Sequence, residues 1–227
     1  GLVPPRRNWM VEGCFPAANV CMVSGDGGIG KTILLLQLCA AAATGQPWLD
    51  LSVTRGRSIY FACEDDRDEL WRRMYDVAAG LGVDLADIGE NMLLRSRVGQ
   101  DNFLIEFEYG KPVKTELWES LVTRCKAFGA SYVVIDTASQ TFRGNQSNET
   151  QVSAYINQLR QLAIAIQGVV IITKHPSMSG RSNGTGMSGN VQWESSVRSR
   201  LYFKKNKEGV RMLEGVKNNY GLPMKPV

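Results

Sequence analysis

This chain contains an octapeptide that fits the pattern GxxxxGK(S/T) in full, which requires a strand before it and a helix after it. Its glycines let the backbone curl so that several N–H groups point at phosphate oxygens, and the following helix adds its positive N-terminal dipole. Lys31 is expected to reach the β- and γ-phosphates of a nucleoside triphosphate, and the Thr32 hydroxyl to ligate Mg²⁺. The phosphate-binding residues are Gly25, Asp26, Gly27, Gly28, Ile29, Gly30, Lys31 and Thr32.

The segments on either side of this loop supply the strand and the helix that it needs. Residues 19–23 form an apolar run that is typical of a buried strand. Residues 32–43 are rich in Leu and Ala and predict a helix, which Gly45-Gln46-Pro47 ends. This apolar stretch is far shorter than the ~20 residues of a membrane span, and the Pro- and Arg-rich start does not resemble a signal peptide. We therefore expect a cytoplasmic protein that does not contact a membrane.

Strands and helices alternate along the rest of the chain. Further strands are predicted over residues 58–62, 131–136 and 168–173, and helices over residues 65–79, 115–127 and 149–167. The core strands are apolar on both faces, which indicates an α/β fold with a mostly parallel, twisted sheet and helices on both faces. Residues 200–217 predict two antiparallel C-terminal strands joined by a charged turn.

The segment over residues 81–114 is harder to assign. Within it, residues 92–94 and 103–107 are apolar and fit the strands of a small hairpin or excursion. The length suits one sizeable α/β domain and no internal repeat is evident, so we expect a single domain over residues 1–227, with this excursion inside it.

The composition excludes some classes of site but does not identify a binding partner. The formal net charge of +4 permits contact with nucleic acid but does not argue for it. The five cysteines include no CxxC pair and are odd in number, which indicates buried thiols in a reducing compartment rather than a disulfide framework. His175 is the only histidine, so zinc sites that need several histidines are excluded.

Acidic residues follow two of the predicted strands. Asp136 ends one strand and is expected to hold Mg²⁺ through water or together with Thr32. Glu64 comes directly after another strand and is expected to orient or deprotonate the attacking water. The neighbouring Asp65 and Asp66 are better explained as acids at the N-terminus of the next helix.

His175 stands just past a third predicted strand. Because the carboxyl ends of parallel strands meet at one edge of a sheet, His175, Glu64 and Asp136 are expected beside the phosphate loop. A polar residue at this place can contact the γ-phosphate and report its presence to the following loop. A structural role is the alternative for a lone histidine.

As an ordered set, these residues resemble the RecA-type ATPases, and most closely the RepA-like hexameric replicative helicases and their phage and plasmid relatives. The resemblance rests on SGDGGIGKT, FACEDD, VVIDT, ITKHP, GTGMSGNVQWESSVRSRLYF and GVKNNYG. It implies a RecA-like P-loop NTPase core assembled as a hexameric ring, with ATP and Mg²⁺ between subunits. On that pattern Glu64 matches the catalytic glutamate, Asp136 the Walker B acid and His175 the γ-phosphate sensor.

The same resemblance assigns cations near the C-terminal end. Arg198, and less directly Arg200, match the arginine region that reaches a neighbour's nucleotide, and Lys217 resembles the lysine that acts in trans in RecA-type proteins. A cation from a neighbour offsets negative charge on the transferred phosphoryl group and makes hydrolysis depend on assembly. From the residues alone, a solvated basic strand edge is the alternative.

Two loops are candidates for contact with single-stranded DNA. Residues 141–146 follow the Walker B strand and residues 177–190 follow His175, and both would emerge at the centre of a RecA-like ring. The side chains expected to grip DNA phosphates are Arg143, Asn145, Arg181 and Asn183. Neither loop is strongly basic or rich in aromatic residues, so flexible solvated loops are the alternative.

These features predict an ATP-hydrolysing DNA motor, a ring-forming replicative helicase that translocates on single-stranded DNA with a primase or loader protein as a partner. A recombination or repair ATPase that forms filaments would use the same core residues. A nucleotide-switched binding protein, whose ATP turnover times the release of a partner, is the alternative from another class.

Overall fold

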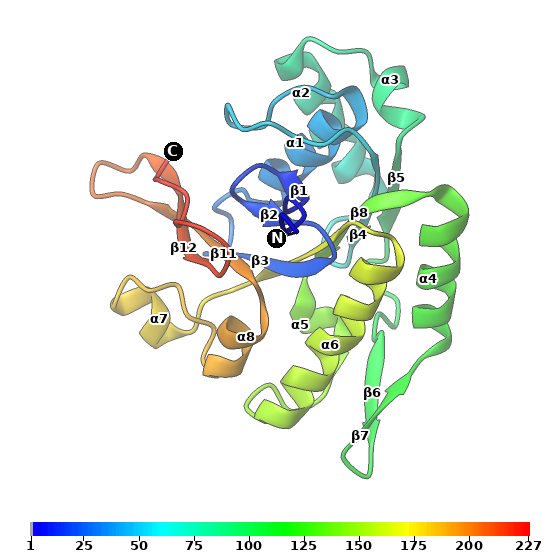
Figure 1. Ribbon diagram of the computed structural model, residues 1–227, viewed down its shortest axis with the longest axis vertical. Helices are drawn as coiled ribbons and strands as arrows, with labels where there is room; N and C mark the ends of the chain where they lie inside the picture. The colour runs from blue at the N-terminus through cyan, green and yellow to red at the C-terminus, as the bar shows by residue number, and fades with distance from the viewer. Residues whose placement is uncertain (1) are drawn as a thin grey trace.

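The computed structural model describes residues 2–227 and has a seven-stranded sheet at its centre (Figure 1). The strand order is β12-β11-β3-β10-β8-β4-β5, and every neighbouring pair is parallel except β11 with β12. The strands are β3 Asn19–Gly25, β4 Arg57–Ala62, β5 Met92–Ser96, β8 Ala130–Asp136, β10 Val169–Lys174, β11 Ser199–Lys205 and β12 Arg211–Asn218. The expected α/β fold, with a mostly parallel sheet and antiparallel C-terminal strands, is confirmed.

Helices cover both faces of this sheet. They are α1 Lys31–Thr44, α2 Arg67–Leu81, α3 Leu85–Gly89, α4 Glu116–Phe128, α5 Ala138–Thr141, α6 Glu149–Ala165, α7 Met178–Ser182 and α8 Val191–Ser196. Successive side chains of a strand point to opposite faces. Accordingly, Cys21 and Val23 of β3 pack with α1, α2 and α3, whereas Val20 and Met22 pack with α4 and α6. None of the helices described over residues 2–227 has the length and apolarity needed to span a bilayer.

Helix α1 is buried along most of its length because it lies between the sheet and α2. Its Leu- and Ala-rich sequence suits that position, since small and branched apolar residues pack closely without needing polar partners. The helix ends at Gly45, which adopts φ +78° and donates its N–H to the carbonyl of Ala41. The predicted stop signal is therefore used, and α1 carries the phosphate loop on a rigid support.

The segment over residues 81–114 divides between two sheets. Residues 92–94 belong to β5, the edge strand of the main sheet. The prediction that they form part of a small hairpin is therefore wrong. The hairpin consists of β6 Ile105–Glu108 and β7 Lys111–Lys114, and β9 Phe142–Arg143 adds to it. It projects from the lower end of the molecule in Figure 1. The other small sheet pairs β1 Trp9–Val11 with β2 Phe15–Pro16.

Candidate active site

The phosphate loop connects the end of β3 to the start of α1. Gly28 and Gly30 adopt φ values of +70° and +107°, which side chains other than glycine rarely allow. A Cβ atom on Gly25 would lie 2.6 Å from the carbonyl oxygen of Phe203, so that position also requires glycine. Three of the loop's four glycines are therefore explained by the loop's own backbone and by its close contact with β11.

The side chain of Lys31 turns back over this loop. Its ammonium donates to the carbonyls of Gly25 at 2.8 Å and Asp26 at 2.9 Å, and lies 3.3 Å from Nδ1 of His175. Burial lowers the pKa of Lys31, and the nearby carboxylates of Asp136 and Glu64 oppose that shift. Phosphate oxygens would be stronger acceptors for this ammonium than the carbonyls, because they carry charge.

Asp136 is buried and accepts hydrogen bonds from three hydroxyl groups. Thr32 Oγ1 and Tyr60 Oη donate to Oδ2 at 2.8 and 2.6 Å, and Thr173 Oγ1 donates to Oδ1 at 2.5 Å. A carboxylate in direct contact with the phosphate-loop hydroxyl is the oxygen donor set that Mg²⁺ takes beside nucleotide phosphates. The residues present thus fit the ion that the sequence predicts.

Tyr60 was not singled out by the sequence analysis, which treated it only as a strand residue. Burial and the charge of Asp136 raise the pKa of Tyr60 well above its usual value. The phenol therefore remains protonated and can donate to Asp136 throughout the physiological pH range. The available signal was a polar-tipped side chain inside the otherwise apolar strand that precedes Glu64.

Glu64 is exposed and lines a cavity of about 410 Å³ together with Lys31, Thr32, Asp136 and His175. Within residues 2–227 its carboxylate has no ion-pair or side-chain hydrogen-bond partner. The adjacent acids differ from it. Asp65 pairs with Arg73 at 2.6 Å, and Asp66 accepts a hydrogen bond from the first turn of α2. Of the three consecutive acids, Glu64 is the one left free to contact water in the cavity.

The three cations expected to act in trans occupy different surroundings. Arg198 is half-buried next to Val20, and because β11 runs parallel to β3 it lies at the opposite end of the strands from the phosphate loop. Among the described residues, its guanidinium has no ion-pair or hydrogen-bond partner. This cation is free to contact another molecule.

Arg200 and Lys217 both have partners within the chain. The Arg200 Nε atom lies 2.6 Å from a carboxylate oxygen of Glu194, and its other nitrogens donate to loop carbonyls at 3.0 Å. Lys217 donates to the carbonyls of Glu194 and Ser195 at the end of α8. Burial lowers the pKa of both Arg200 and Lys217. These two side chains fix α8 and the preceding loop against β11 and β12.

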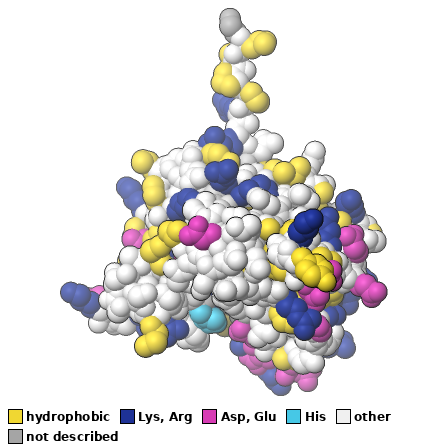
Figure 2. Space-filling view, turned by 90° about the horizontal axis from the view of Figure 1, so that it is seen from below, with side chains coloured by type: hydrophobic (Ala, Val, Ile, Leu, Met, Phe, Trp, Pro, Cys, Tyr) yellow, Lys and Arg dark blue, Asp and Glu magenta, His cyan; other side chains and the backbone are white. Residues whose placement is uncertain are grey.

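The four residues expected to bind DNA each have a partner within the chain. Arg143 pairs with Glu106 of the hairpin at 2.8 Å, whereas the Nε atom of Arg181 lies 3.0 Å from a carboxylate oxygen of Asp26 in the phosphate loop. Asn145 and Asn183 each accept a backbone N–H two residues further on, so both shape turns. On the face drawn in Figure 2, Lys and Arg side chains are dispersed rather than gathered around the histidine.

This arrangement, with a glycine-rich phosphate loop, a buried Walker-type acid and a free glutamate at the carboxyl edge of a parallel sheet, defines a P-loop ATPase. The AAA_25 family model, described as an AAA domain, matches residues 2–181, so the chain belongs to this family. Membership implies nucleotide binding, typically with Mg²⁺.

The fold is also similar to that of a solved structure, the KaiC-like protein from the hyperthermophilic archaeon Pyrococcus horikoshii. The two chains are 17% identical, with a TM-score of 0.65, and the match covers 98% of this chain and 94% of that chain. At this identity the likeness concerns the fold alone, which is RecA- and KaiC-like.

Proposed function

We propose that this chain is an ATP-hydrolysing DNA motor of the replicative-helicase type, which assembles as a ring and translocates on single-stranded DNA. The observation that carries its ATP-hydrolysing part is the free carboxylate of Glu64 in the same cavity as Lys31, Thr32 and Asp136. An acid so placed is suited to activating water beside a triphosphate whose position the loop fixes.

The chemistry then follows from the residues in the cavity. The loop N–H groups and Lys31 bind the phosphates, and Thr32 with Asp136 would hold Mg²⁺, which neutralises phosphate charge when bound. Glu64 accepts a proton from a water molecule while the oxygen of that water forms a bond to the γ-phosphorus. The bond to the bridging oxygen breaks, and ADP and phosphate are released.

A chain of contacts supports coupling of this cavity to the first candidate DNA loop and to α8, the helix that follows the second. Lys174 precedes His175, donates to the side chain of Gln146 at 2.9 Å and lies 4.2 Å from the ring centre of Trp193. The indole N–H of Trp193 donates to the carbonyl of Gln146. A displacement of His175 by the γ-phosphate would therefore be transmitted through Lys174 to the first loop and to α8.

A nucleotide-switched binding protein remains the second candidate, and one observation favours it. Arg143 and Arg181 are both ion-paired within the chain, so neither is free to contact DNA phosphates without exchanging its partner. In this second function, phosphate binding would release Arg181 from Asp26 and change the loop that a partner recognises.

The experiment that tests the proposal is steady-state ATP hydrolysis without DNA, with single strands and with duplex, with Lys31→Ala as the inactive control. Stimulation by single strands that Lys31→Ala abolishes supports the motor and justifies an unwinding assay. Measurable hydrolysis that no DNA changes would contradict the motor and favour the nucleotide switch.

A further inference from the structure

The tip of the β6–β7 hairpin presents an unusual residue. Glu108 and Lys111 pair across the hairpin, which leaves Tyr109 and Gly110 as the two turn residues, with φ values of +50° and +78°. Two-residue turns with positive φ at both positions favour Asn, Asp and Gly. A tyrosine there is disfavoured by its backbone conformation, and its side chain is fully exposed. The Tyr109 side chain therefore buries no surface within the chain that would offset the strain of its backbone.

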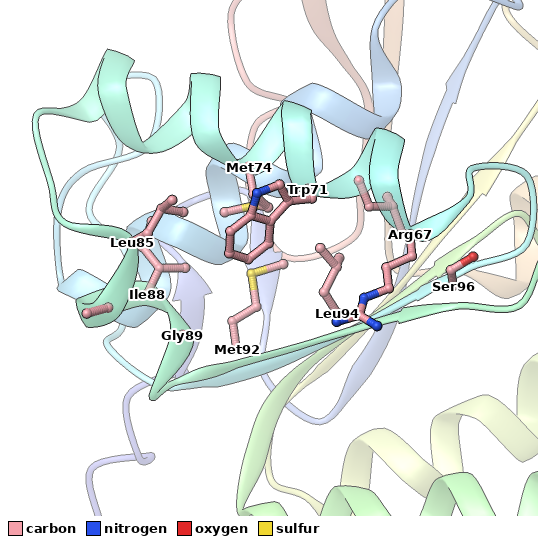
Figure 3. Close-up of a pocket in the computed structure, with 11 residues that line it drawn as sticks. Arg67, Trp71, Met74, Leu85, Ile88, Gly89, Met92, Leu94 and Ser96 are labelled. Carbon is pink, nitrogen blue, oxygen red and sulfur yellow. The ribbon is translucent and has the colours of Figure 1, made fainter.

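A groove elsewhere on the molecule has matching chemistry. It lies between α2, α3 and β5, has a volume of about 420 Å³, and its apolar wall includes Leu70, Trp71, Met74, Ile88, Met92 and Leu94. Figure 3 shows Arg67 and Ser96 at one end of the groove and Leu85 with Ile88 at the other. Among the described residues, the Arg67 guanidinium has neither an ion pair nor a side-chain hydrogen bond. The groove therefore combines apolar walls with a free cation at one end.

We propose that the hairpin tip of one copy docks in this groove of a second copy. Tyr109 packs against Trp71 and Met74, and the adjacent Glu108 pairs with Arg67. An aromatic anchor in an apolar pocket, flanked by an ion pair to arginine, is the combination that dominates protein interfaces. The proposal rests on the assembly assumed in the proposed function and names the surfaces that form it.

The positions of the two surfaces indicate a second copy rather than the same chain. In Figure 1 the hairpin lies at the lower end of the longest axis and α2 and α3 lie at the upper end, so the tip does not reach its own groove. A contact between two different surfaces repeats from copy to copy and gives a ring or a filament.

The charge of the tip disfavours DNA as its partner. Two acids, Glu106 and Glu108, balance two lysines, Lys111 and Lys114, on the hairpin strands. Binding of nucleic acid depends on an excess of cations that replace counterions on the phosphates. This hairpin carries no such excess, whereas a single acid beside Tyr109 suffices to pair with Arg67.

A charge exchange tests the contact in the full chain. The association constant is measured by sedimentation velocity with Mg²⁺ and a non-hydrolysable ATP analogue. Tyr109→Ser, Glu108→Arg and Arg67→Glu should each weaken self-association on the order of tenfold. The combined Glu108→Arg and Arg67→Glu variant should regain most of the loss, while Lys111→Glu, a matched charge change on the same tip, should have little effect.

Cross-linking gives a second, independent readout. All five native cysteines are buried, so Lys111→Cys combined with Ser96→Cys places the reactive thiols on the two proposed surfaces and keeps Tyr109 in place. Oxidation should produce a ladder of dimers, trimers and longer species, because each copy carries one thiol of each kind. Either single variant should give nothing larger than a dimer.

Three results would overturn the docking contact: a wild-type chain that stays monomeric, a charge exchange that restores nothing, or Tyr109→Ser with unchanged assembly. If Tyr109→Ser instead lowers affinity for single-stranded DNA, the tip contacts nucleic acid. The proposed function fails separately, if the assembled wild-type chain hydrolyses ATP without responding to DNA.

Discussion

At the carboxyl ends of β3, β4, β8 and β10, polar side chains from separate segments converge on one cavity. Between α7 and β12, by contrast, four of the eight Lys and Arg side chains are held by acids or carbonyls of the same chain. Glu64 and Lys31 illustrate the first region, and Arg200 and Lys217 the second. The position of a motif residue therefore follows from the end of the strand that carries it. The role of a cation depends instead on the acids and carbonyls that tertiary packing brings near it.

The largest effect is expected from Arg198, the one trans candidate that the described residues leave without a partner. Arg198→Ala should lower turnover by about 10³-fold, the scale of a cation acting on a transferred phosphoryl group, with ATP binding intact. Mixing it with Lys31→Ala should restore part of the activity, because each variant supplies what the other lacks. A wild-type turnover rate in the Arg198→Ala variant alone would show that Arg198 takes no part in hydrolysis.

A loss of stability rather than turnover is expected at Arg200, which is 6% exposed and paired with Glu194. Arg200→Ala should lower the free energy of unfolding by about 3 kcal/mol or more, because it leaves a buried carboxylate unpaired. Chemical denaturation measures this value. The combined Arg200→Met and Glu194→Met variant should recover most of the loss. Unchanged stability of the Arg200→Ala variant would contradict a structural role for the pair and favour a role of Arg200 in trans.

The pH dependence of stability should reveal Lys174, which connects the two regions. Burial lowers its pKa to about 8, so the unfolded chain binds more protons than the folded chain between pH 8 and about pH 10. The charged form therefore costs stability below pH 8, and that cost disappears as the pH rises. The stability of Lys174→Met relative to wild type should fall by about 2 kcal/mol across this window. A difference that does not vary with pH would refute the shifted pKa.

The smallest effect is expected at Tyr60, which orients Asp136. Tyr60→Phe removes one hydrogen bond, worth about 1 kcal/mol, and should raise the Mg²⁺ concentration for half-maximal hydrolysis about fivefold. Tyr132→Phe is the matched control, because its hydroxyl also binds inside the protein but donates to backbone carbonyls of Met10 and Thr54. An equal change in the Mg²⁺ requirement of both variants would indicate a general packing effect.

Much of the fold was predictable from local patterns. Residue type and spacing predict the phosphate loop, the strands that end at Asp136 and Lys174, and the end of α1 at Gly45. The edge strand β5 was ambiguous because its partner, β4, lies about thirty residues earlier, and a short apolar run does not indicate which strand it pairs with.

The site was predictable to the extent that it depends on the ends of strands. Asp136 and His175 reach the phosphate loop for that reason, and no tertiary contact had to be known. Tyr60 and Thr173 were missed because they act through hydrogen bonds to another side chain, which sequence spacing does not encode. The internal pairing of Arg200 with Glu194 is of the same kind.

The most direct test of the account is ATP hydrolysis by Glu64→Gln, measured together with nucleotide binding. This change keeps the shape of the side chain but removes the base that faces the cavity. We expect a rate about 10²- to 10⁴-fold below wild type, with nucleotide affinity unchanged. A wild-type rate in Glu64→Gln would contradict the role of Glu64 as the base, because hydrolysis would then not need its carboxylate.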